Sequence, residues 1–343
     1  MTRVDEFDYS LPEELIATEP APRRDASRLL VLEAADGRIR HRSFDEIPRF
    51  LRGGDALVLN ESRVFKARLP GHRETGGTAE ALFLRPLGGA VWLALIGTRG
   101  KVRPGEYFLL ADGALRIRTL EKDDVGRWSV EAVDGDVERV MDERGMVPLP
   151  PYITRKRGTV ETTRLDVERY QTVYAARTGS VAAPTAGLHF TSELLERLAA
   201  DGVRVLRVTL HIGYETFRPV RTGTVEEHRM HAERYEVASE VMDALEETRA
   251  AGGRVVAVGT TSVRVLETLA RGAPPAGWTD IFIYPPFRFR LTDALITNFH
   301  LPRSTLLMLV CAFGGRENVM AAYREAVQMR YRFYSYGDAM LIV

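Results

Sequence analysis

The sequence contains one cysteine, four lysines and no long uninterrupted apolar stretch. The single cysteine, Cys311, excludes an internal disulfide and a zinc site built from cysteines, and its place in the apolar run Leu306–Phe313 favours a buried thiol. The first residues are acidic and lack an apolar stretch of signal-peptide length. No window approaches the ~18 apolar residues that a membrane helix requires. We therefore expect a cytoplasmic protein without a membrane segment.

The charge is balanced, with 47 basic and 47 acidic residues among 343, which argues against indiscriminate nucleic-acid binding. The distribution of charge is uneven, because residues 254–332 contain ten arginines and five acidic residues. Genome base composition could explain the excess of arginine over lysine. The placement of the arginines is more informative than their number, since guanidinium groups pair with phosphates and stack on bases.

Turn residues divide the first half of the chain into short strands. Leu29–Leu32 and Ala56–Leu59 are apolar runs bounded by such residues. Five alternating stretches follow: Ala79–Leu84, Val91–Ile96, Tyr107–Leu110, Leu115–Thr119 and Trp128–Val133. Their spacing, without a convincing helix between them, is typical of a small antiparallel barrel or sandwich. We expect an all-β domain of residues 71–146, inserted into a larger domain of residues 1–70 and 147–343.

Helix and strand patterns alternate from about residue 170 onward. The predicted helices are Ser192–Ala200, Ser239–Ala251 and Ser262–Arg271, and the predicted strands are Val203–Leu210, Val255–Val258 and Ile281–Tyr284. This alternation predicts an α/β layer with largely parallel strands. Ligands of such sheets bind outside the carboxyl ends of the strands, so those ends are the first places to look for a site.

The loop after Val255–Val258 is one candidate anion site. It contains Thr260, Thr261 and Ser262 and leads into a helix, whose first amides suit a phosphate or the carboxylate of an amino-acid group. From this segment alone, an ordinary helix N-cap is the better interpretation.

Two histidines are candidates for acid–base chemistry. His189 ends the loop Val181–Phe190, whose small residues would let a ligand approach the backbone closely, and His211 follows the strand Val203–Leu210. Imidazole titrates near neutral pH, so the pair is suited to act as acid and base. A lone histidine in a turn is more often structural, and this alternative stays open.

His228 and His231 have the separation of a helical ligand pair, but no third histidine or cysteine lies close in the sequence. We therefore predict no metal site and favour a polar surface that binds substrate. Further along, Tyr284–Arg290 and Tyr331–Asp338 alternate aromatic rings with arginines, and Asn298–Arg303 leads into a helix. Such segments are common in single-stranded RNA recognition, and the alternative is a set of core aromatics with solvated arginines.

In this order, the segments resemble the S-adenosylmethionine:tRNA ribosyltransferase-isomerases of queuosine synthesis over nearly the whole chain. The motifs include FDYSLP (7–12), NESRVFKARL (60–69), PLPPYI (148–153), YQTVY (170–174), HRMH (228–231) and TNFHLP (297–302). Segments 182–190, 210–220, 258–266, 280–285 and 331–338 also match. Each motif is weak alone, and the order and spacing make the set specific.

The resemblance implies a large mixed α/β, barrel-like domain interrupted by a small β-barrel. It also implies a reaction in which S-adenosylmethionine donates its ribosyl group to 7-aminomethyl-7-deazaguanine at the wobble position of tRNA. Adenine and methionine leave, and the ring rearranges to an epoxycyclopentanediol, which gives epoxyqueuosine-tRNA. S-adenosylmethionine is then a substrate and tRNA the partner, with no prosthetic group, and we expect a monomer.

This reaction needs a base for the C5′ protons beside the sulfonium, a proton donor for adenine and hydrogen-bond donors for oxyanions in a water-poor cleft. We predict His189 and His211 as proton carriers, with Asp280 and Asp338 as alternative bases. The predicted cofactor contacts are Pro184, Thr185, Gly187, Thr260, Thr261, Ser262 and Arg264. The predicted tRNA or substrate contacts are Asn60, Arg63, His228, His231, Tyr284, Asn298, His300, Arg332 and Tyr336.

Three residues depart from the pattern associated with the family. Glu61 stands in an asparagine-rich motif, and Tyr214 and Glu215 stand where smaller residues are expected. We expect these local changes to bear on donor contacts and not on the reaction class.

The hypothesis requires that the segments containing His189, His211 and Thr260–Arg264 fold together at one pocket. A methyltransferase is one alternative, although no acidic-residue-preceded Gly-x-Gly loop follows an early strand. A non-catalytic tRNA-binding protein that uses the β insert as an RNA platform is the other.

Overall fold

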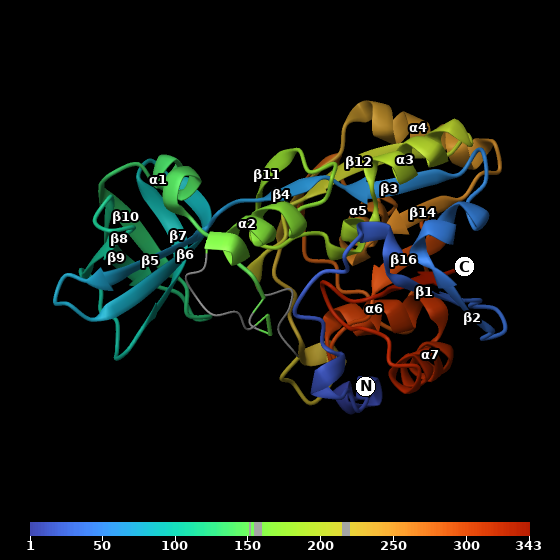
Figure 1. Cartoon of the computed structure of the whole chain (residues 1–343), viewed down its shortest axis with the longest axis horizontal. Helices are drawn as coiled ribbons and strands as arrows, with labels where there is room; N and C mark the ends of the chain where they lie inside the picture. The colour runs from blue at the N-terminus through green and yellow to red at the C-terminus, as the bar shows by residue number, and fades with distance from the viewer. Residues whose placement is uncertain (151, 154–159, 215–219) are drawn as a thin grey trace.

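A nine-stranded mixed sheet forms the centre of the larger part of the molecule (Figure 1). The computed structural model describes all residues except 151, 154–159 and 215–219. The strand order is β15-β13-β12-β3-β14-β16-β17-β1-β2, which leaves β15 and β2 as the two edges. The strands are β1 Arg28–Leu32, β2 Ile39–Ser43, β3 Ala56–Asn60, β12 Arg204–Leu210, β13 Glu233–Glu236, β14 Val255–Val258, β15 Ala276–Thr279, β16 Ala294–Asn298 and β17 Ala339–Ile342.

The centre of the sheet is parallel and its flanks are antiparallel. Strands β12, β3, β14 and β16 run parallel to one another, as do β1 and β17. The pairs β16–β17, β1–β2, β12–β13 and β13–β15 are antiparallel. The prediction of largely parallel strands therefore holds for the central strands, where β–α alternation gives parallel neighbours.

Helices cover both faces of this sheet because its central strands are apolar on both sides. On β3, Ala56 and Val58 belong to the core that includes helices α4 to α7, whereas Leu57 and Leu59 belong to the core that includes α3. The α-helices are α1 Val137–Arg144, α2 Val160–Arg169, α3 Ser192–Ala200, α4 Ser239–Ala250, α5 Thr260–Leu269, α6 Thr305–Gly314 and α7 Arg316–Gln328. The 3-10 helices are Val4–Phe7, Glu13–Leu15, Arg24–Ala26, Phe44–Arg49, Thr185–His189 and Val225–Glu227.

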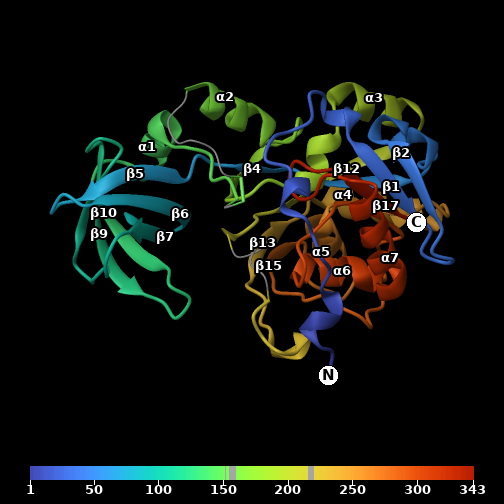
Figure 2. The same ribbon diagram turned by 60° about the horizontal axis from the view of Figure 1, so that its bottom comes forward.

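A closed barrel of six strands lies beside the α/β part, as Figures 1 and 2 both show. Its strands are β5 Arg68–Arg73, β6 Thr78–Gly88, β7 Val91–Thr98, β8 Tyr107–Leu110, β9 Leu115–Lys122 and β10 Trp128–Asp134. They enclose a core of their own, to which α1 contributes Val140 and Met141. The short strands β4 Ser62–Val64 and β11 Arg177–Ser180 form a separate parallel pair.

The predicted mixed α/β fold with a small β-barrel is confirmed, and three local predictions need correction. Helix α1 was not predicted in the β insert, although Asp136 caps it by accepting from the amide of Arg139. Helix α5 begins at Thr260, two residues early, because Gly259 with φ of 86° ends the strand abruptly. Ile281–Tyr284 is not a strand.

The strand in that region is β15, directly before the predicted one. The carbonyl of Ile281 accepts from Nε of Arg264 (3.3 Å) rather than from a neighbouring strand, which removes it from the ladder. Ile283 is nonetheless buried, which accounts for the apolar signal in the sequence. Cys311 is buried as predicted. Across the described residues, no helix combines the length and the apolar character needed to cross a membrane.

Candidate active site

The carboxyl ends of the central strands lie together along one side of the sheet, and Asn60 is at the carboxyl end of β3. Asn60 ends β3 and is fully buried. Its Nδ2 donates to the carbonyl of Leu210 (3.0 Å) and to Oγ1 of Thr261 (3.2 Å). Its Oδ1 accepts from the amides of Ser62 (3.1 Å) and Leu210 (3.1 Å). Asn60, a predicted substrate contact, therefore uses its amide group to hold the ends of β3 and β12 against the start of α5.

A narrow cavity of about 50 Å³ lies at this edge. Six predicted site residues line it together with their neighbours: Pro184, Thr185, Thr260, Thr261, Asn298 and His300. The first amides of α5 have no acceptors within the helix and carry its positive dipole end, which favours an anion. The volume suits a carboxylate-sized group and is too small for a nucleoside.

Asn298 presents an unsatisfied acceptor in this cavity. Its Nδ2 donates to the carbonyl of Tyr334 (3.1 Å) and to Nε2 of His189 (3.1 Å). Because a carbonyl can only accept, the contact with Tyr334 fixes the orientation of the amide. The Oδ1 of Asn298 is buried and has no hydrogen-bond partner among the described residues. Such an atom is suited to accept from an N–H group of a ligand.

His189 lies behind Asn298 and is 4% exposed. Since Nε2 accepts from Asn298, Nδ1 carries the proton and donates to Oγ of Ser27 (2.7 Å). The ring stacks on Phe44 with centroids 5.0 Å apart. Burial, with the charges of Arg24 and Arg332, lowers the pKa of His189 to about 3. Both nitrogens of this neutral ring are engaged, and His189 does not line the cavity.

A second, larger cavity of about 770 Å³ lies between the barrel and the edge of the sheet. The barrel contributes residues such as Arg85 and Trp92, and the α/β part contributes His211, His228 and His231, among others. Ile212 lines both cavities, so the two are adjacent. The volume is within the range of small-molecule sites.

His211 lines this larger cavity, and its ring packs against Gly179. Its Nδ1 is buried without a hydrogen-bond partner among the described residues. Burial and the charge of Arg234 lower the pKa of His211 below its ordinary value. Gly179 with φ of 149° makes room for the ring, because a Cβ there would lie 2.6 Å from Nδ1. A neutral imidazole with an unoccupied nitrogen is suited to accept a proton.

The turn after His211 is held by a buried ion pair. Arg264 of α5 pairs with Glu233 of β13, and their side chains are 4% and 6% exposed. The other oxygen of Glu233 accepts from the amide of Gly213 (2.8 Å). Arg264 also donates to the carbonyls of Thr279 (3.2 Å) and Ile281. The guanidinium of Arg264 is thus committed to the protein rather than to either cavity.

Several other predicted residues also have structural partners. Ser262 donates to the carbonyl of Val258 (2.8 Å). Asp338 is buried and accepts from the amide and Nε of Arg28 (2.9 and 3.1 Å) and from the amide of Arg332 (2.8 Å). The Nε2 of His300 bonds to Oγ1 of Thr297 (2.8 Å), and burial lowers the pKa of His300 to about 3.

Gly187 packs against Tyr174 rather than beside a cavity, since a Cβ there would lie 1.9 Å from the hydroxyl oxygen. Tyr336 is buried with its ring edge-on to Tyr170, and exposed Arg63 donates to the carbonyl of Ala175. Asp280 is exposed and lines neither cavity.

His228 and His231 follow a 3-10 helix rather than lie on an α-helix, so the helical ligand spacing does not apply to them. His228 packs edge-on against Phe282 (5.3 Å between centroids), whose ring is 4.8 Å from Tyr284. Tyr284 itself lines neither cavity. Among the described residues, no group of three histidine, cysteine or acidic side chains is placed to hold a metal ion.

Of the residues that depart from the expected pattern, Tyr214 lines the larger cavity. Glu61 lies 3.8 Å from Nε of Arg177, and Glu215 is outside the described residues. The sequence interpretation missed Glu233, Arg85, Arg234 and Trp278, all of which line the larger cavity. They lie in segments without motif or periodicity that would single them out.

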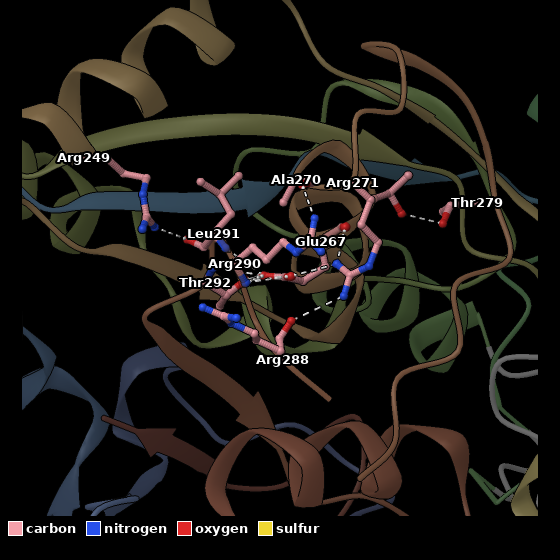
Figure 3. A network of polar contacts seen from close by, with 10 residues as sticks. Arg249, Glu267, Ala270, Arg271, Thr279, Arg288, Arg290, Leu291 and Thr292 are labelled. Carbon is pink, nitrogen blue, oxygen red and sulfur yellow. Dashed lines mark hydrogen bonds and ion pairs between the residues drawn. The ribbon is translucent and has the colours of Figure 1, made fainter. Parts of the chain in front are cut away.

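Figure 3 shows a further buried carboxylate that the sequence did not indicate. Glu267 of α5 is fully buried and accepts from the amides of Arg290, Leu291 and Thr292 (3.0 to 3.2 Å). It also pairs with Arg271 (3.0 Å). Glu267 therefore anchors the end of the aromatic and basic segment Tyr284–Arg290 to α5.

Comparison with known proteins gives consistent matches over the whole chain. Residues 4–342 match the family described as "Queuosine biosynthesis protein". The chain is 52% identical to an S-adenosylmethionine:tRNA ribosyltransferase-isomerase from Symbiobacterium thermophilum, over 99% of this chain and 100% of that protein. It is 50% identical to a protein of the same name from Acetivibrio thermocellus, over 99% of each chain.

A solved structure agrees with this result. The crystal structure of an S-adenosylmethionine tRNA ribosyltransferase from Thermotoga maritima is similar with a TM-score of 0.56 and 42% identity, over 98% of this chain and 100% of that chain. The sequence comparisons and the similar solved structure lead to one conclusion. The chain belongs to the queuosine biosynthesis protein family, whose curated members are S-adenosylmethionine:tRNA ribosyltransferase-isomerases.

Proposed function

We propose that this protein transfers the ribosyl group of S-adenosylmethionine to 7-aminomethyl-7-deazaguanine at the wobble position of tRNA and isomerises it. The products are epoxyqueuosine-tRNA, adenine and methionine. One observation supports this most: a carboxylate-sized cavity at the start of α5 adjoins a cavity of about 770 Å³ that His211 lines. Family membership supplies the identity of the two substrates.

The methionine end of S-adenosylmethionine is placed in the narrow cavity by this proposal. Its carboxylate would accept from the first amides of α5 and the hydroxyls of Thr260 and Thr185. Its ammonium would donate to Oδ1 of Asn298, the buried acceptor for which the described residues supply no donor. The nucleoside would then extend past Ile212 into the larger cavity.

His211 is the proton carrier in this arrangement. Its free Nδ1 and lowered pKa suit a base for the acidic C5′ protons beside the sulfonium. His189 acts as a positioning residue, because its Nε2 accepts from Asn298 and thereby directs Oδ1. Asp280 and Asp338 are less suited, since one is exposed away from both cavities and the other is buried against Arg28.

The test is incubation of the protein with S-adenosylmethionine, labelled in the adenine and the methionine, and tRNA that carries the precursor base. Release of both free adenine and methionine supports the proposal. S-adenosylhomocysteine would indicate methyl transfer instead, and RNA binding without turnover would indicate a binding module. Within an active enzyme, Asn298→Ala should raise the KM for S-adenosylmethionine, whereas His211→Ala should lower kcat at saturating donor.

The remaining expectations concern organisation. We propose a cytoplasmic monomer in which residues 71–146 fold as a domain inserted between 1–70 and 147–343. The barrel's separate core supports this division. Light scattering at assay concentration tests the monomer, and limited proteolysis that releases a stable fragment near residues 71–146 tests the domain.

A further inference from the structure

The larger cavity contains a row of three side chains that runs from His211 to the edge of the sheet. The amide of His211 donates to the carbonyl of Arg234 (2.9 Å), and Arg234 pairs in register with Trp278. These residues belong to the end of β12, to β13 and to β15, which are adjacent in the sheet. All three line the cavity, so their side chains lie on the same face. Two strand spacings of ~4.8 Å place Trp278 about 10 Å from His211.

Trp278 is exposed in a way that the other tryptophans are not. Its exposed fraction is 57%, whereas those of Trp92 and Trp128 are 7% and 4%. Exposure of so large an apolar side chain at the mouth of a cavity is typical of a binding site. The guanidinium of Arg85, which the barrel supplies, lies 5.8 Å from the centre of the Trp278 ring. The indole therefore lies where residues of the barrel and of the α/β part both line the cavity.

The cavity has a small excess of positive charge. Its cationic side chains are Arg85, Arg127, Arg221 and Arg234, and its acidic ones are Glu138, Asp142 and Glu233. Glu233 is neutralised by buried Arg264 and Arg127 pairs with Asp123 (2.6 Å), which leaves three arginines and two carboxylates. Arginines beside an exposed aromatic face are the combination that holds an unpaired nucleotide, through phosphate pairing and base stacking.

From this row we propose that Trp278 stacks on the base of the nucleotide next to the reacting one in the tRNA, while the reacting base lies at His211. The inference rests on the proposed function and deepens it, because it assigns a residue that sets the position of the RNA. Arg234 lies between the two bases and faces the phosphate that links them.

The experiment uses the full-length enzyme and an anticodon stem-loop oligoribonucleotide that carries 7-aminomethyl-7-deazaguanine. Trp278→Ala should raise the KM for this RNA about 5- to 150-fold, the range expected from loss of one base–aromatic stack. The KM for S-adenosylmethionine and the Tm should stay unchanged. Trp278→Phe should restore most of the affinity, because a phenyl ring still stacks. Met329→Ala is the matched control, since Met329 is 52% exposed and lines neither cavity.

A second measurement separates stacking from a structural role. An RNA that lacks the base on one side of the reacting nucleotide should have a KM with the wild-type enzyme that is raised as much as Trp278→Ala raises the KM of the intact RNA. With the Trp278→Ala enzyme, removing that base should raise the KM no further. The inference is wrong if, for each of the two neighbouring bases, the KM increases from base removal and from Trp278→Ala multiply. It is also wrong if Trp278→Ala leaves the KM for the intact RNA unchanged. One further result would overturn the inference. Arg85→Ala would raise the RNA KM as much as Trp278→Ala does, and neither abasic RNA would lose its effect in the Trp278→Ala enzyme. Trp278 would then act by contacting Arg85 of the barrel and not by stacking on a base. A wild-type enzyme that releases no adenine would instead reject the proposed function.

Discussion

Replacing Arg264 by methionine should destabilise the protein strongly, and this follows from the partners of the guanidinium. The change removes the ion pair with Glu233 and the bonds to the carbonyls of Thr279 and Ile281. It leaves Glu233, whose side chain is only 6% exposed, without the charge of Arg264. Breaking one side of such a buried pair costs about 3–5 kcal/mol. With an unfolding entropy of ~2.1 cal/mol/K per residue, a chain of 343 residues should show a fall in Tm of about 4–7 °C.

The assay is thermal unfolding of four proteins: wild type, Arg264→Met, Glu233→Met and the double variant. The double variant should be more stable than the sum of the single changes predicts, because it leaves no unpaired charge. It should still lose kcat, since the amide of Gly213 beside His211 no longer has the Glu233 oxygen. An Arg264→Met protein with an unchanged Tm and a raised KM for S-adenosylmethionine would refute this reasoning, and would show that Arg264 binds the donor.

Three further predictions concern single sites. Gly179→Ala should lower kcat about 100-fold, because its Cβ would displace the ring of His211 and small misplacements of catalytic groups have such effects; Gly100→Ala is the control. His189 has a pKa of about 3 in the folded protein, so it stays neutral there while the unfolded state takes a proton below pH ~6.5. The free energy of unfolding should therefore fall by about 1.4 kcal/mol per pH unit below that pH. Urea midpoints measured at several pH values should depend less on pH in His189→Gln than in the wild type. Glu267→Ala should cost about 3 kcal/mol by removing the acceptor of the amides of Arg290, Leu291 and Thr292, of which only Thr292 is buried. It should also speed hydrogen exchange at residues 290–292, whereas Glu240→Ala on the exposed face of α4 should do neither.

The secondary structure was predictable where the pattern is local. Strand β14 and helix α3 have the predicted bounds, because β14 is a continuous apolar run and Thr191 caps α3 directly before its first residue. The strand predicted at Ile281–Tyr284 was wrong because burial of Ile283 comes from packing outside a sheet. Periodicity reports burial and not the hydrogen-bond partner.

The site was predictable as a set of segments and not as a set of contacts. The loop before His189, the turn after His211 and the start of α5 do converge, and Ile212 lines both cavities. The sequence could not show that Arg264 is paired with Glu233, 31 residues away, because that contact depends on the position of β13. The row from His211 to Trp278 likewise depends on the register of two antiparallel strand pairs.

The position of β17 in the sheet has a consequence for how the molecule assembles. β17 lies between β16 and β1, so in the described part of the chain the hairpin of β1 and β2 is hydrogen-bonded to the sheet through β17. Asp338, just before β17, bonds to the amide of Arg28 across 310 residues of chain. Contacts this distant in sequence form slowly, because the long loop between them must close first. We therefore expect the hairpin of β1 and β2 to pair with the rest of the sheet late in folding, after the carboxyl-terminal strand β17 has formed.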